Sequence, residues 1–173
     1  EVRARGGYQT LQRVVTAMTP EQVTKEVTAA GILGHGGAAF PVGRKWSVIH
    51  LNDSQPHYLC ANADEGEPGT FKDRWILENA PHLLLESMLI SAFALQVRHA
   101  FVYIRGEFDL PYRRLAAALA EAAAAGYVGE GILDSDFGCE IIVYRGAGSY
   151  VCGEASGLLS SIEGKRGYPR NRP

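Results

Sequence analysis

The sequence predicts an α/β fold, a Rossmann-like parallel sheet flanked by helices. The main observation is the order of its segments: three short apolar runs, typical of buried strands, alternate with segments of helical length. A parallel sheet with right-handed crossovers accommodates this alternation. The composition agrees, because 173 residues with 46% hydrophobic and 21% charged side chains can form a core without disulfide bonds.

The first predicted helix begins with a capping box. Thr19 offers a hydroxyl cap, Pro20 occupies the first helical position, and Gln22 stands three residues after the cap. Gly31 is a natural terminator for this helix. The glycine-rich loop that follows, residues 34–41, can present bare backbone N–H groups to an anion.

The first strand is expected at residues 58–61, where the run Tyr-Leu-Cys-Ala is short and apolar. It leads into an acidic loop, residues 62–69. A helix then begins at Pro81 and reaches about Val97. This helix is apolar on most sides, so we expect it to be buried.

The second and third strands are expected at residues 100–104 and 140–144, which are again short and apolar. Between them, a helix begins at Asp109, includes an alanine-rich stretch and ends at Gly126. A last helix is expected over residues 153–162.

The strand ends predict where a ligand would bind. Ligands of parallel α/β sheets lie beyond the carboxyl ends of the strands. The acidic loop (62–69) and a second glycine-rich loop, residues 146–150, both follow such ends. We therefore expect a site where these two loops meet the loop at 34–41, with Lys45 nearby to supply positive charge.

Several classes of function are not indicated. The net charge is −2, and no basic block favours nucleic acid or a membrane surface. The longest apolar stretch, residues 83–97, is too short to cross a bilayer. The three cysteines, Cys60, Cys139 and Cys152, are too widely spaced for a zinc site or a disulfide framework, so we expect free thiols and no metal.

The acidic loop admits two interpretations. Asp64, Glu65 and Glu67 stand within four residues and would repel one another unless solvated, hydrogen-bonded or bound to a cation. The loop is either a solvated turn or a site that hydrogen-bonds sugar hydroxyls, as acidic residues do at the ribose of NAD. Asn62 beside them offers a donor and an acceptor to the edge of a heterocycle.

Four motifs together carry a family resemblance, at residues 34–46, 62–74, 146–154 and 163–170. In these motifs and their order the chain resembles the FMN- and NADH-binding flavoprotein subunit of respiratory complex I. The related diaphorase subunits of NAD-linked hydrogenases and formate dehydrogenases share the resemblance, which covers nearly the whole chain.

The resemblance implies an FMN-dependent NADH dehydrogenase, in which NADH gives a hydride to FMN and electrons pass on to iron–sulfur clusters. By matched position, the FMN-binding residues would be Gly34, Gly36, Gly37, Lys45, Asn62, Asp64, Tyr150, Gly153 and Glu154. The NADH site would include Phe40, Glu65 and Glu67, with the two glutamates as the catalytic residues.

The resemblance also implies a domain organisation, partners and a location. Residues 1–173 would form one FMN/NADH-binding domain, a fragment without the ubiquitin-like domain and without the domain whose cysteines hold a four-iron cluster. The partners would be NADH and the iron–sulfur subunits of a multi-subunit redox complex, with no nucleic acid and no direct membrane insertion. We expect a cytoplasmic location, or a peripheral one at the inner face of a membrane through partner subunits.

Four positions depart from the family pattern. His35 replaces an arginine, Ala39 a glycine, Val48 an aromatic residue and Ala155 a glutamate. The last change removes a carboxylate that would bond the adenosine ribose and repel a 2′-phosphate. Two alternatives therefore stay open: an NADPH-linked diaphorase, and a degenerate nucleotide-binding or assembly module without catalysis.

Overall fold

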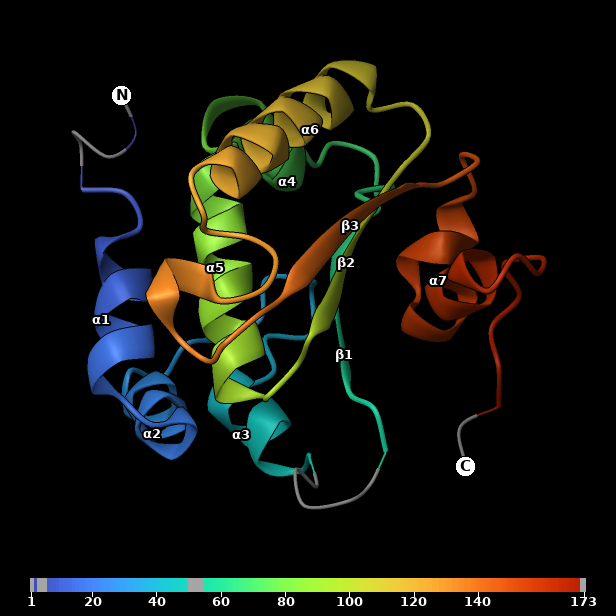
Figure 1. The fold of residues 1–173 in the computed structure, drawn as a ribbon. Helices are drawn as coiled ribbons and strands as arrows, with labels where there is room; N and C mark the ends of the chain where they lie inside the picture. The colour runs from blue at the N-terminus through green and yellow to red at the C-terminus, as the bar shows by residue number, and fades with distance from the viewer. Residues whose placement is uncertain (1, 3–5, 50–54, 172–173) are drawn as a thin grey trace.

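A three-stranded parallel sheet forms the centre of the structure, a computed structural model that describes residues 2, 6–49 and 55–171. The strands are β1 (Tyr58–Ala63), β2 (His99–Ile104) and β3 (Glu140–Arg145), in the order β1-β2-β3. Ala63 pairs with Ile104, which pairs with Arg145, so the three carboxyl ends are flush. The predicted α/β class and all three predicted strands are confirmed (Figure 1).

Helices precede and follow these strands. Their bounds are α1 (Gln9–Ala17), α2 (Pro20–Ala29), α3 (Val42–Ser47), α4 (Lys72–Asn79), α5 (Pro81–Ala94), α6 (Asp109–Ala124) and α7 (Ala155–Ile162). Single 3₁₀ turns lie at Ile132–Asp134 and Tyr150–Gly153. The four predicted helices correspond to α2, α5, α6 and α7. Residues 172 and 173, at the end of the predicted domain, lie outside the described residues.

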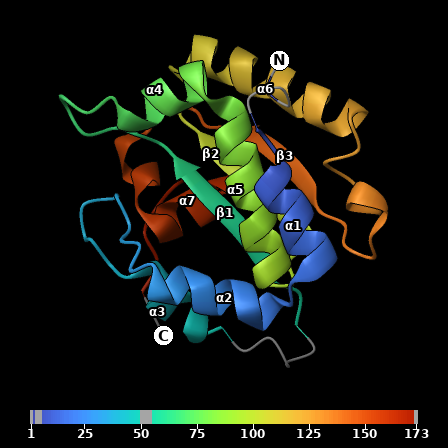
Figure 2. The ribbon, with the colours of Figure 1, turned by 90° about the vertical axis from the view of Figure 1, so that its left-hand side faces the viewer.

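One face of the sheet carries the main core. The buried side chains Leu85 and Leu89 of α5 belong to the same apolar cluster as Val102 and Ile104 of β2. Helix α6 contributes Leu115 to this cluster. Figure 2 shows α5 lying across the sheet, with α1 and α2 on the side of α5 that faces away from the sheet. The predicted burial of the α5 segment is confirmed for its inward side chains.

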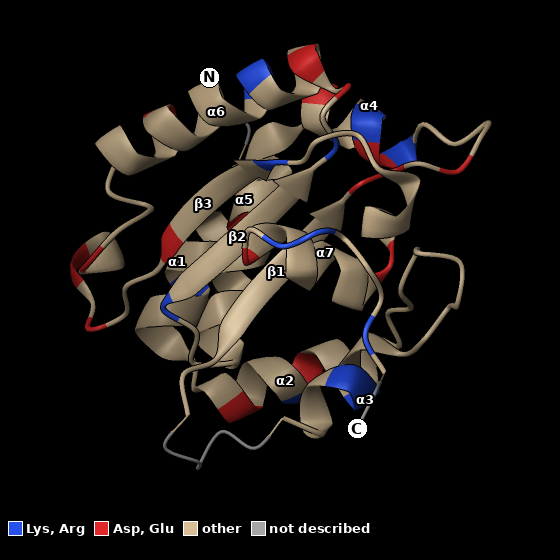
Figure 3. Ribbon diagram, turned by 90° about the vertical axis from the view of Figure 1, so that its right-hand side faces the viewer, with Lys and Arg blue, Asp and Glu red and all other residues tan. Residues whose placement is uncertain are grey.

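The opposite face is covered by α7 at the carboxyl half of the strands. Leu158 and Cys152 pack there on Tyr103. The hydroxyl of Tyr144 donates to the carbonyl of Ser161 over 2.9 Å and ties α7 to β3. Figure 3 looks onto this face of the sheet. Within the described residues, none of the helices is both long and apolar enough to span a bilayer.

Helix α1, which the sequence analysis did not predict, depends on a distant carboxylate. No side chain of its own caps the helix. Instead, the carboxylate of Glu86 in α5 accepts hydrogen bonds from the backbone N–H groups of Tyr8, at 3.0 Å, and Leu11, at 3.2 Å. These bonds satisfy N–H groups that a helix start leaves without partners. Packing on α5 therefore determines this helix.

Helix α3 is positioned by a close backbone approach. Gly43 is buried against α2, and a Cβ atom at this residue would lie 2.6 Å from the Cα atom of Thr28. Real Cβ atoms essentially never approach a backbone atom so closely. Only glycine allows α3 to lie against α2 at this distance.

Replacing this glycine should separate the two helices. Gly43→Ala is expected to lower the free energy of unfolding by roughly 1–3 kcal/mol, the usual cost of overpacking. Urea unfolding measures the change, with Gly36→Ala as the matched control, because a Cβ at residue 36 would meet no atom within 4 Å. Equal unfolding midpoints for the two variants would contradict the close approach.

Candidate functional site

The acidic loop and the loop after β3 meet at the carboxyl end of the sheet. The side-chain amide of Asn62 donates to the carbonyl of Gly153 over 2.8 Å. The hydroxyl of Tyr150 donates to the carboxylate of Glu67 over 2.6 Å. These bonds join residues 91 and 83 positions apart. The structure therefore brings together two of the three loops that the sequence placed at one site.

Asp64 lies at the centre of this junction. It is 8% exposed, and its Oδ2 atom has no hydrogen-bond partner among the described residues. Its backbone N–H donates to the Asn62 side chain, while the Cα of Gly153 faces it so closely that a Cβ there would lie 3.3 Å from the Asp64 carbonyl oxygen. Burial raises the pKa of Asp64, and the positive charge of Arg105 opposes that rise.

A buried carboxylate oxygen without a donor is uncommon and costly. Here it lies where ligands of parallel sheets bind. Asp64 can therefore accept a hydrogen bond from an N–H or O–H group of a ligand.

Glu65, by contrast, supports the structure. Its two carboxylate oxygens accept hydrogen bonds from the backbone N–H groups of Asp73, at 2.9 Å, and Arg74, at 3.1 Å. Both N–H groups belong to the first turn of α4, which has no side-chain cap of its own. Glu65 thus connects the acidic loop to α4, and its catalytic role stays a prediction.

Glu67 and Tyr150 form the rim of the junction. Glu67 is exposed, and so is Tyr150, at 68%. The Tyr150 ring lies on Gly66, where a Cβ would come within 3.1 Å of the ring. The hydrogen bond to Glu67 raises the pKa of the Tyr150 phenol, so the phenol stays a donor. Both side chains can contact a molecule that approaches from solvent.

Glu154 is the N-cap residue of helix α7. Its Oε2 atom accepts hydrogen bonds from the backbone N–H groups of Ser156 and Gly157, each at 2.9 Å. A carboxylate is favourable at this position because the helix dipole is positive there. Ala155, which replaces the glutamate of the family pattern, is the first residue of the same helix.

The glycine-rich loop at 34–41 keeps its backbone open. A hydrogen bond from Gly34 N–H to the Phe40 carbonyl closes it at 2.9 Å. Added Cβ atoms at Gly36 and Gly37 would meet nothing within 4 Å, and Ala39 adopts φ = 48°, a left-handed conformation that glycine favours. Ala39 thus keeps a backbone conformation suited to the glycine that it replaces.

This loop lies on the same side of the molecule as the acidic loop (Figures 2 and 3). In the part of the chain that the structure describes, no hydrogen bond joins the two loops. Lys45 belongs to α3, and its positive charge opposes the effect of burial on the pKa of Cys60 in β1. Burial raises that thiol pKa to about 11, so Cys60 stays protonated at neutral pH.

The sequence analysis missed Arg105. This residue follows β2 directly, so the strand-end rule that selected the other two loops also applies to it. Its guanidinium donates to the carbonyl of Glu65 over 2.6 Å and pairs with the carboxylate of Glu107 at 3.0 Å. Arg105 is therefore part of the same junction.

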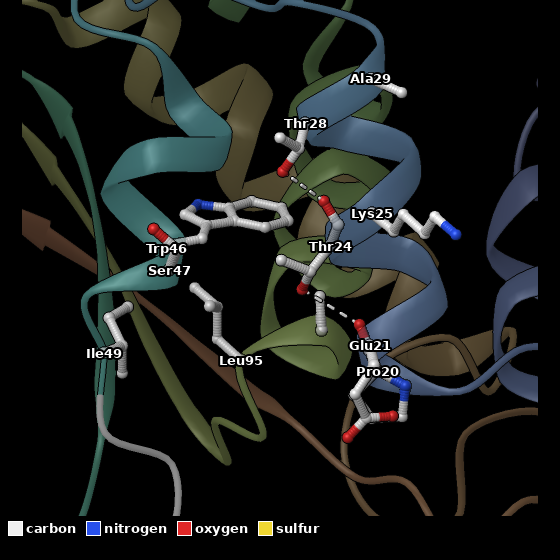
Figure 4. A pocket seen from close by; sticks show the side chains of 11 residues that line it. Pro20, Glu21, Thr24, Lys25, Thr28, Ala29, Trp46, Ser47, Ile49 and Leu95 are labelled. Atoms are coloured by element: carbon white, nitrogen blue, oxygen red, sulfur yellow. Dashed lines mark hydrogen bonds between the residues drawn. The ribbon is translucent and has the colours of Figure 1, made fainter.

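A hollow of about 520 Å³ lies elsewhere, between α2, α3 and the end of α5 (Figure 4). Trp46 and Leu95 give it an apolar lining. The hydroxyls of Thr24 and Thr28 on its wall donate to carbonyls of their own helix. None of the residues that the sequence predicts for the site lines this hollow, so it is not the candidate site. No group suited to hold a metal ion occurs within the described residues.

The chain is similar to several known proteins. The Nuo51 FMN-binding domain family matches residues 27–173. The F 2 subunit of the NADH-quinone oxidoreductase of Rhizobium meliloti (strain 1021) is 48% identical over 98% of this chain and 40% of its own length. The F subunit of the Escherichia coli (strain K12) oxidoreductase is 44% identical over 100% of this chain and 39% of its own length.

A crystal structure of an NAD⁺-reducing [NiFe]-hydrogenase in the H₂-reduced state has the same fold. Its TM-score is 0.78 with 40% sequence identity, over 89% of this chain and 26% of the hydrogenase chain. The chain spans about two fifths of the length of the curated relatives. The resemblance seen in the sequence is confirmed: this chain belongs to the Nuo51 FMN-binding domain family.

Proposed function

We propose that this chain binds FMN and NADH as the flavin domain of an NADH dehydrogenase. The observation that carries the proposal is the buried Asp64 carboxylate, which has an unpaired Oδ2 atom at the junction of two strand-end loops. The family match and the printed names of the relatives support the same function.

The residues present fit FMN. The isoalloxazine ring carries one N–H donor on an edge that otherwise holds acceptors, and Asp64 offers a buried acceptor without a partner. The open glycines Gly36 and Gly37, together with Lys45, would hold the negatively charged phosphate. When bound, FMN supplies the exchange between two-electron and one-electron transfer.

The remaining predicted residues would surround this pocket. Glu67, exposed at the rim, would line the nicotinamide side, and Tyr150, which donates a hydrogen bond to it, would contact the flavin. Phe40, 48% exposed with the Arg44 guanidinium 5.8 Å from its ring centroid, offers a ring face to the adenine. Glu65 would shape the wall by holding α4, and Asn62 and Gly153 would fix the loops around the ring.

The domain would act within a longer flavoprotein that passes electrons to iron–sulfur subunits of a redox complex. Its cluster ligands lie outside this chain, because Cys60, Cys139 and Cys152 do not have the spacing of a four-iron site. We place the protein in the cytoplasm, or at the inner face of a membrane through those partner subunits.

A second candidate is an NADPH-linked diaphorase. One observation favours it: Ala155 leaves the start of α7 without the extra carboxylate that would repel a 2′-phosphate.

An anaerobic titration tests these proposals. The full-length protein is loaded with FMN, and the flavin absorbance is followed as NADH or NADPH is added. Bleaching by NADH supports the proposal, and bleaching by NADPH alone favours the second candidate. A protein that takes up no FMN, or whose flavin neither nucleotide reduces, would be a non-catalytic assembly module.

Asp64 should make stability depend on pH. Its pKa is raised in the folded protein, whereas an exposed aspartate titrates near about 3.9 in the unfolded chain. Between these values the folded state binds more protons, so FMN-free protein should lose stability as the pH rises above about 4. Asp64→Asn should remove that loss, and the variant should be the more stable form at pH 7.

Urea unfolding across this pH range measures the effect of Asp64. Glu163→Gln provides a control of opposite sign, because hydrogen bonds from Lys165 and Arg170 lower the pKa of Glu163. Wild type should therefore gain stability from Glu163 only as the pH rises to about 4.5, whereas the loss caused by Asp64 continues above that pH. A stability difference between Asp64→Asn and wild type that is the same at every pH would contradict the burial of Asp64.

Glu67→Gln should slow flavin reduction by NADH while FMN stays bound. The change removes a negative charge at the rim but leaves Asp64 and the glycine-rich loop intact. We expect a loss of roughly tenfold in rate, the equivalent of one hydrogen bond to a charged group. Anaerobic stopped-flow absorbance measures it, with the exposed and distant Glu26→Gln as control. Loss of FMN from the Glu67 variant would show that the residue holds the flavin instead.

A further inference from the structure

The guanidinium of Arg105 makes hydrogen bonds in two directions. Its Nη1 atom donates to the Glu65 carbonyl over 2.6 Å. Its Nε and Nη2 atoms donate to the two carboxylate oxygens of Glu107, over 3.1 and 3.0 Å. A planar guanidinium can make both sets of bonds at once, whereas a lysine ammonium cannot match the paired geometry.

The backbone of Arg105 also contacts the acidic loop. Its N–H donates to the carbonyl of Ala63, the last residue of β1, over 3.3 Å. Arg105 therefore contacts the acidic loop on both sides of Asp64, through Ala63 and through Glu65. The carboxylate of Glu65 is held separately by the first turn of α4.

The charge of Arg105 also acts on Asp64. It opposes the rise in the Asp64 pKa that burial causes, while Glu107 adds to that rise. Glu107 is in turn paired with Arg105, and this pairing lowers the Glu107 pKa. The two residues thus form a unit in which Arg105 is the group that makes the direct bond to the acidic loop.

We propose that Arg105 is a positioning residue for the flavin site. By fixing the Ala63 and Glu65 peptides, it sets the direction of the Asp64 carboxylate, which would contact FMN. This role rests on the proposed function. Glu107 serves mainly to orient the guanidinium, so the bond from Arg105 to Glu65 matters more for FMN than the ion pair does.

Three variants of the full-length protein test this order of importance: Arg105→Gln, Arg105→Lys and Glu107→Gln. The dissociation constant of FMN is measured by quenching of flavin fluorescence, and urea unfolding of the FMN-free protein is measured on the same preparations. Arg105→Gln should weaken FMN binding by roughly tenfold, the scale of one hydrogen bond from a charged group. Arg105→Lys should recover part of that loss. Glu107→Gln, which keeps the bond to Glu65, should weaken binding by less than about threefold.

A merely structural role predicts a different pattern. FMN affinity would then follow unfolding stability, and Glu107→Gln would weaken binding as much as Arg105→Gln at equal loss of stability. That result would overturn the proposal, as would unchanged FMN affinity in Arg105→Gln. Failure of the wild-type protein to bind FMN would instead overturn the proposed function, and the role of Arg105 with it.

Discussion

The in-register pairing of three parallel strands is the constraint on which the site depends. Because Ala63, Ile104 and Arg145 are paired neighbours, the segments that follow them begin at one level. The acidic loop, Arg105 and the glycine-rich loop after β3 therefore leave the sheet side by side. A shift of one residue in the register would turn the side chains of one strand to the opposite face and separate these groups.

Three carboxylates in this chain support the starts of helices, whereas two at the candidate site do not. Glu65, Glu86 and Glu154 accept hydrogen bonds from the first turns of α4, α1 and α7. Each satisfies N–H groups that would otherwise lack partners and places negative charge at the positive end of a helix dipole. Asp64 and Glu67 cap no helix among the described residues. One is buried with an unpaired oxygen, and the other is exposed at the rim, which suits them to different parts of one ligand.

The sheet itself explains why the site lies at one end. Parallel sheets are usually covered on both faces. Helix α7 covers the carboxyl half of one face through Tyr103 and Tyr144, so a packed layer lies beneath the candidate site. At the amino-terminal half of that face, Tyr58 is 60% exposed and Phe101 is only partly buried. Of the two halves of this face, the carboxyl half is therefore the one that a helix covers.

The sequence by itself determined the strands, the helices with local signals and the two strand-end loops that meet at the candidate site. Apolar runs indicate β1 to β3, and the capping box at Thr19 is formed as predicted. Tertiary structure decided α1, because its stabilising carboxylate is distant: Glu86 lies 78 residues from Tyr8. It also decided α3 and α4, which have no side-chain cap of their own and depend on Thr28 and on Glu65 of other segments. It further decided which acidic side chain keeps an unpaired oxygen. The burial of Asp64 and the hydrogen bonds of Glu65 depend on how the segments pack, which the motif alone does not encode. A sequence motif names the residues that could bind, whereas the folded chain determines which of their hydrogen bonds are already used.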